Sequence, residues 1–307
     1  RMDINYFLKT RILDGGMGQE LIKKGLKPRG TLWSASALLD NKFHKLLIDV
    51  HLSFINSGAD VIVTNTFSSR KLRLIQNKVQ KHFNFINEQA CLLAIKAKEL
   101  SKKNILIAGS LPAQNDTYVE DIRETKLIEK DFYEQASIIS PFVDFFYLDV
   151  MGSGKEIDIA SNIAAKLNKR VLVGVHLKKN GKLPSGESIE NIVNKYRNEN
   201  WLGIICACVS LEIIESATIE MNKLNISFGF KANLWKREEP TPVHSFNTAK
   251  YNEIGKNPNI VLGKREDITG KIFYDFSKKV MEKGATILGG CCETNPEHIN
   301  AISKLKY

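Results

Sequence analysis

The chain has 307 residues, of which 43% are hydrophobic and 25% are charged, with 44 Lys and Arg against 34 Asp and Glu. This is the composition of an ordinary globular protein, and the length fits one α/β barrel of roughly 250 residues with insertions. No apolar run approaches the roughly 20 residues that a membrane span needs, and the amino terminus, RMDINYFLKT, lacks the apolar stretch of a signal peptide.

The formal net charge of +10 raises the possibility of a nucleic-acid partner. The basic residues are scattered, however, in short groups such as those at 70–73 and 178–182. No arginine-rich run or interleaved aromatic platform accompanies them. We therefore interpret the charge as a solvated basic surface, and we expect neither a nucleic acid nor a membrane as partner.

Short β-rich runs alternate with longer helical patterns along the whole chain. The runs predict strands at 10–14, 60–65, 104–109, 144–149, 170–176, 202–206, 226–230 and 285–290. Most are continuously apolar, which is typical of parallel strands buried on both faces. Helical patterns lie between them, for example at 87–101 and 273–283. This alternation predicts an α/β fold, a (β/α)8 TIM barrel, as a single domain over residues 1–307.

The longest irregular stretch, residues 233–265, contains Pro240, Pro242 and Pro258. We expect it to be a long βα loop over the catalytic face of the barrel.

Five cysteines, an odd number, do not form the framework of a secreted disulfide protein. A reducing cytoplasm suits them better. Cys91, inside a helical pattern, is expected in the core.

Two adjacent thiols, Cys291 and Cys292, follow an apolar strand and two glycines. Cys206 ends the strand at 202–206, on the same rim of the barrel. Three thiolates with one open position suit a catalytic zinc site that alkylates sulfur. The alternative is a set of buried, inert thiols. Cys208, two residues after Cys206, has the same strand parity and could share its inward face.

The first strand is followed by Asp14 in the turn Asp14-Gly15-Gly16-Met17-Gly18. An acid there would repel phosphate and would suit a cationic amine, although Asp14 could also cap a helix. Asp149, at the end of the fourth strand, is a second acid on this rim. His176 either lines the site or is structural, and His298 is expected to be a surface or packing residue.

Taken together, these motifs resemble the homocysteine S-methyltransferase family, which includes betaine–homocysteine methyltransferase and the enzymes that use S-methylmethionine. The resemblance spans nearly the whole chain, through ILDGGMGQEL at 12–21, GADVIVTNTF at 58–67, GIIC at 203–206 and GGCCETNPEHI at 289–299.

The resemblance implies that Cys206, Cys291 and Cys292 bind Zn²⁺ and that Asp14 holds the amino group of homocysteine, with Asp149 as a second substrate-binding acid. It implies no catalytic residue beyond the metal site. The expected reaction gives methionine by methyl transfer from a small sulfonium donor, S-methylmethionine or S-adenosylmethionine. Because eight residues follow the 289–299 motif in this sequence, we expect no folate- or cobalamin-binding module. Betaine remains an alternative donor.

Three positions depart from the family pattern. Ile205 stands where Asn usually precedes the first zinc cysteine, Asp149 stands in place of Glu, and Glu293 follows the cysteine pair where Gly or Arg is common. A non-catalytic zinc- or homocysteine-binding barrel with lost or altered activity is therefore the alternative function.

Overall fold

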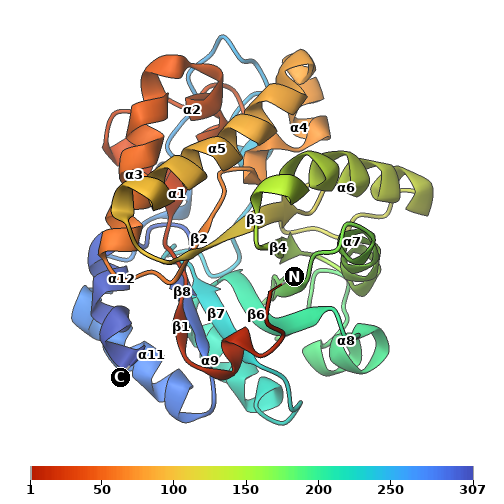
Figure 1. Ribbon diagram of the computed structural model, residues 1–307, viewed down its shortest axis with the longest axis vertical. Coiled ribbons are helices and arrows are strands. Elements are labelled where there is room, and N and C mark those ends of the chain that lie inside the picture. The colour runs from red at the N-terminus through yellow and green to blue at the C-terminus, as the bar shows by residue number, and fades with distance from the viewer. Residues whose placement is uncertain (1, 307) are drawn as a thin grey trace.

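Eight parallel strands form one sheet in the order β1-β8-β7-β6-β5-β4-β3-β2, and each overlaps a strand predicted from the sequence. In this computed structural model, which describes residues 2–306, the strands are β1 (Arg11–Ile12), β2 (Val61–Val63), β3 (Leu106–Pro112), β4 (Phe145–Met151), β5 (Val171–Val175), β6 (Trp201–Val209), β7 (Phe228–Ala232) and β8 (Ile287–Gly290). A parallel bridge between Leu13 and Val61 joins the two edges of the sheet. The strands therefore surround a common axis, as Figure 1 shows.

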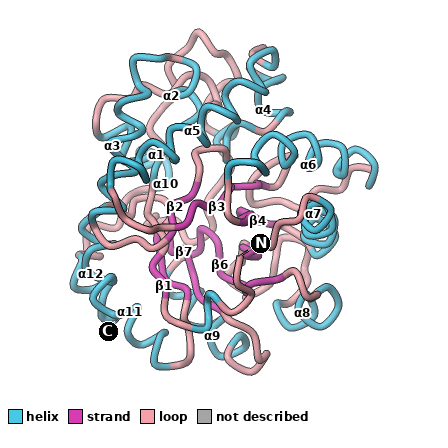
Figure 2. The backbone as a smooth tube through the Cα atoms, viewed as in Figure 1, coloured by secondary structure: helices cyan, strands magenta, loops and turns pink. Residues whose placement is uncertain are grey.

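Helices lie between successive strands and surround the barrel (Figure 2). They are α1 (Met17–Lys23), α2 (Ser36–Leu39), α3 (His44–Asn56), α4 (Lys71–Gln76), α5 (Phe83–Ser101), α6 (Thr125–Ile139), α7 (Gly154–Lys166), α8 (Ile189–Tyr196), α9 (Leu211–Met221), α10 (Asn259–Leu262), α11 (Gly270–Glu282) and α12 (Pro296–Ser303). The predicted (β/α)8 barrel is confirmed. Among residues 2–306, no helix is both long and apolar enough to cross a membrane.

Five of these helices begin at a residue whose side chain accepts a hydrogen bond from the helix's first turn. Their N-caps are Ser153 (α7), Ser188 (α8), Ser210 (α9), Thr269 (α11) and Asn295 (α12). Such caps satisfy backbone N–H groups that have no partner inside the helix. The start of each of these five helices is therefore fixed by its local sequence.

One end of the barrel is closed by the amino-terminal segment. The ring of Phe7 lies 5.9 Å from that of Phe145, edge to face, inside the barrel. The hydroxyl of Thr286 donates to the carbonyl of Phe7 at 2.6 Å. The opposite end, at the carboxyl ends of the strands, is where barrel enzymes build their sites.

The segment between β7 and α11 covers that second end. It contains only α10 and a short 3-10 turn, Val243–Ser245. Trp235, Val243 and Leu262 of this segment line the pocket at the barrel mouth. The position expected for residues 233–265 is therefore confirmed.

Candidate metal centre

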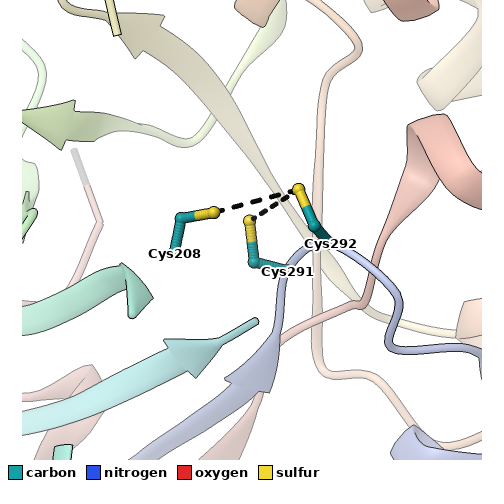
Figure 3. A group of neighbouring side chains, drawn as sticks. All are labelled: Cys208, Cys291 and Cys292. Carbon is teal, nitrogen blue, oxygen red and sulfur yellow. Dashed lines mark hydrogen bonds between the residues drawn. The ribbon is translucent and has the colours of Figure 1, made fainter. Parts of the chain in front are cut away.

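Three cysteine sulfurs meet at the carboxyl ends of β6 and β8 (Figure 3). The Sγ of Cys292 lies 3.8 Å from that of Cys208 and 3.9 Å from that of Cys291, and all three lie within 4.8 Å of one another. Tetrahedral zinc, with Zn–S bonds of about 2.3 Å, places its sulfur ligands about 3.8 Å apart. The number, chemistry and spacing of these donors fit a zinc ion.

Cys206 is not part of this cluster, so the expected place of the third thiol is corrected by two residues. Cys206 packs into the layer between the barrel and its helices, together with Ile204 and Val209. Cys208 belongs to the barrel interior, together with Ile205 and Ala207. Strict alternation would have put residues 206 and 208 on the same face.

A β-bulge explains the difference. The pairing of β6 with β7 shifts register between Ala207 and Val209, and Cys208 has a left-handed backbone with φ 57°. A bulge inserts one extra residue and locally breaks the alternation of side chains. Ala207 and Cys208 therefore both face inward. Because Cys208 and not Cys206 joins the cluster, the residue before the first clustered cysteine is Ala207. The departure from the family pattern expected at Ile205 therefore falls at Ala207.

Two polar side chains contact Cys208. The amide of Asn233 donates to the Cys208 carbonyl at 2.7 Å, which supports the left-handed peptide. The hydroxyl of Tyr118 lies 3.3 Å from the Cys208 sulfur. Interactions with the thiols of Cys291 and Cys292, together with the contact to Tyr118, hold the pKa of Cys208 well below its usual value, and the same interactions raise the pKa of Cys291 and Cys292. Within the cluster, the thiolate, the form that binds metals, is therefore favoured at Cys208.

The cysteine pair is held by the β1–α1 turn. The backbone N–H of Gly16 donates to the carbonyl of Thr294 at 3.0 Å, and the hydroxyl of Thr294 donates to the carbonyl of Cys291 at 2.6 Å. Glu293, with φ 68°, is buried, accepts a hydrogen bond from Gln19 and lies 3.9 Å from Lys264. Its charge therefore has partners of its own.

Asp14 lies at the barrel mouth as expected, but it already has a cationic partner. Asp14 is 1% exposed; it forms an ion pair with Lys231 and accepts the N–H of Val63 at 2.9 Å. Burial raises the pKa of Asp14, and the charge of Lys231 offsets part of that increase. It does not cap α1, whose N-cap is Gly16.

Asp149 also lines the pocket. It accepts a hydrogen bond from the hydroxyl of Ser110 at 2.8 Å. Burial raises the pKa of Asp149 to about 7, and the electrostatic effect of the neighbouring Cys291 adds to the increase. Asp149 also lies in an irregular part of β4, because the pairing of β4 with β5 shifts register between Leu148 and Met151.

The other candidates do not line this pocket. His176 is buried with its ring centroid 4.7 Å from that of Tyr118, and burial lowers its pKa to about 4. His298 packs against Phe273, accepts the N–H of Asn295 and so completes a capping box. Cys91 lies in the core, as expected.

The pocket beside the sulfurs encloses about 160 Å³. That is comparable with a cavity of about 150 Å³ that accommodates benzene, so it suits a small organic molecule. Trp33, Phe67 and Trp235 form apolar walls, and Asp14, Asp149 and Arg70 supply charge.

Sequence reasoning missed Lys231, Tyr118 and Arg70. Lys231 is a lone cation in an apolar run, one residue beyond the strand predicted at 226–230. Extending that strand by two residues would have put Lys231 at its carboxyl end, where barrel enzymes place functional groups. Tyr118 and Arg70 lie in loops, and no local pattern marks them.

Comparisons with known proteins identify the family and the fold of this chain. A family model described as homocysteine S-methyltransferase matches residues 11–305. The chain is 23% identical to a selenocysteine methyltransferase of Astragalus bisulcatus, with 97% of this chain and 92% of the relative covered. It is also 23% identical to homocysteine S-methyltransferase 2 of Arabidopsis thaliana, with 95% and 92% covered. The metallated form of the Escherichia coli homocysteine methyltransferase MmuM superposes with a TM-score of 0.77 at 19% identity, covering 99% of this chain and all of that chain.

Proposed function

The chain belongs to the homocysteine S-methyltransferase family, and we propose that it moves a methyl group from a sulfonium donor to the thiol of homocysteine, giving methionine. The observation that carries the proposal is the meeting of Cys208, Cys291 and Cys292 beside a pocket lined by Asp14. A non-catalytic role is not favoured, because the relatives named above are methyltransferases.

Cys208, Cys291 and Cys292 would hold the zinc. A bound zinc supplies a Lewis acid that keeps a substrate thiol deprotonated near neutral pH. Three protein thiolates leave one of the four zinc ligands to be supplied by the substrate. A sulfonium donor suits this pocket, because its leaving group departs neutral and needs no general acid.

The chain's own residues would bind and orient the two substrates. Asp14 uses one oxygen for Val63 and the other for Lys231. A carboxylate has about four acceptor positions, so it can still receive a substrate ammonium. Asp149 is a second acid facing the pocket. Trp33 and Trp235 would exclude water, and alignment of the two sulfurs would supply most of the rate enhancement.

A donor panel tests the proposal. Zinc-loaded protein is supplied with homocysteine and, separately, with S-methylmethionine, S-adenosylmethionine, betaine or methyltetrahydrofolate, and methionine is followed by mass spectrometry. We expect turnover with a sulfonium. Turnover with betaine or the folate alone would overturn the donor, and no turnover with any donor would overturn the function.

A further inference from the structure

Arg70 is a buried cation at the barrel mouth. It follows β2, serves as the N-cap residue of α4, lines the pocket beside the cysteines and is only 1% exposed. Fully buried arginines are rare unless they are paired. A guanidinium in this place therefore calls for a partner.

Arg70 lacks such a partner among residues 2–306. Its Nη2 donates to the hydroxyl of Thr117 at 3.2 Å, whereas Nε and Nη1 are buried without an acceptor. Arg73, its neighbour on α4, donates instead to the carbonyl of Thr31 and to Asp116. Buried donors are nearly always satisfied, so two unsatisfied donors on a residue that lines the pocket point to a ligand.

The acids around Arg70 are engaged elsewhere. Asp14 pairs with Lys231. Asp116 contacts Arg73 and His244, and Asp149 accepts from Ser110. In the described chain, no carboxylate lies within 4.0 Å of the Arg70 guanidinium. The Arg70 guanidinium thus has no carboxylate in direct contact, and Asp116 and Asp149 act on it only electrostatically from a longer distance.

The guanidinium is also held in place. Its central carbon lies 5.2 Å from the centre of the Phe67 ring, and Thr117 fixes one nitrogen. The residue after Thr117 is Tyr118, whose hydroxyl contacts the Cys208 sulfur. Arg70 is therefore connected, through one short segment, to the thiol cluster.

We propose that Arg70 is an anion-recognition residue that binds the α-carboxylate of an amino-acid substrate through its free N–H groups. The inference deepens the proposed function and rests on it for the identity of the ligands. An α-amino acid with sulfur in its side chain would then contact the pocket at three points. Its sulfur faces the cysteines, its ammonium faces Asp14, and its carboxylate faces Arg70. Charge-assisted hydrogen bonds of this kind are the stronger class.

Equilibrium binding tests the inference without requiring turnover. Zinc-loaded protein is titrated calorimetrically with L-methionine and with 3-(methylthio)propylamine, which differs only by lacking the carboxylate. We expect the wild type to prefer methionine by about tenfold to hundredfold. Arg70→Gln should remove that preference while leaving the affinity for the amine unchanged. Arg70→Lys keeps the positive charge but lacks the planar guanidinium, so it should keep part of the preference for methionine.

Lys71→Gln is the matched control. Lys71 is the next residue and carries the same charge, but it is more exposed and pairs with Glu134 at 2.9 Å. The loss of this lysine should leave the preference for methionine intact, since it changes only the overall charge of the protein and not a donor in the pocket. A wild type without preference, or Arg70→Gln with the full preference, would overturn the inference. If Arg70→Gln does not fold, the Arg70→Lys variant decides. A preference for methionine in Arg70→Lys as large as in the wild type would then overturn the inference.

Kinetics then identify which substrate supplies the carboxylate. The KM of homocysteine is compared with that of 3-mercaptopropylamine, and the KM of S-methylmethionine with that of its descarboxy analogue. Arg70→Gln removes the difference for the substrate whose carboxylate it binds. Carboxylate-dependent binding without any methyl transfer would support the anion site while refuting the proposed function.

Discussion

Lys231 and Asp14 form a buried ion pair across the barrel mouth, between the end of β7 and the turn that follows β1. Lys231 is 6% exposed, and Asp14 raises its pKa against the opposing effect of burial. The pair puts a protein ammonium beside the acid that we propose for the substrate ammonium.

Because the pair is buried, removing one of its charges should destabilise the fold much more than removing both. Lys231→Met leaves Asp14 buried without its cation, which costs about 3–5 kcal/mol. The double variant Asp14→Asn/Lys231→Met removes both charges and should recover much of that loss. Urea unfolding measures both. As a control, Lys45→Met removes an exposed cation 3.1 Å from Asp49 and should change stability by about 1 kcal/mol or less. A fully stable Lys231→Met variant would contradict the pairing.

Metal content tests the register of β6. Cys208→Ala removes one of three proposed ligands and should lose most bound zinc and all activity. Cys206→Ala is the matched control from the same strand, because its thiol lies in the helix-facing layer. It should keep one zinc per chain, measured by elemental analysis. The opposite pattern would restore Cys206 to the metal site.

A close backbone approach at Gly16 predicts a steric effect on the cysteine pair. A Cβ there would lie 2.6 Å from the carbonyl oxygen of Cys291. Gly16→Ala should therefore displace the cysteine loop, weaken zinc binding and destabilise the fold by about 1–3 kcal/mol. Gly270→Ala, whose added Cβ finds its nearest neighbour at 3.4 Å, should leave both unchanged. Normal zinc affinity in Gly16→Ala would show that the loop position does not matter.

The buried carboxyl group of Glu156 should make the stability of the fold depend on pH. It is fully buried in the first turn of α7, and burial raises its pKa from 4.5 to about 7 despite a hydrogen bond from Ser153 at 2.6 Å. The folded state thus binds this proton more tightly than the unfolded state. The stabilisation that this tighter proton binding gives to the folded state is complete below pH about 4.5. It is lost as the pH rises through about 7.

The variant Glu156→Gln stays neutral at every pH. It should be more stable than the wild type at pH 8, by on the order of 2–3 kcal/mol, and the difference should shrink toward pH 4.5. Denaturant midpoints across that range measure the effect. Parallel stability curves for the two proteins would refute it.

The sequence alone determined the barrel, because its signals are local. Apolar runs at 170–176 and 285–290 can be stable only as strands buried on both faces, and the helices between them are amphipathic. The position of Cys291 and Cys292 also followed from the sequence, since the two glycines and the preceding strand place them at a strand's carboxyl end. Asp14 at the barrel mouth followed for the same reason.

The tertiary structure decided which other residues join them. Parity along β6 could not tell Cys206 from Cys208, because a bulge at Ala207 and Cys208 changes the facing of one residue and depends on pairing with β7. Lys231 meets Asp14 across 217 positions of chain, and Arg70 reaches the pocket from a loop without any motif. Such contacts arise when strands close into a barrel, and local sequence patterns do not record them.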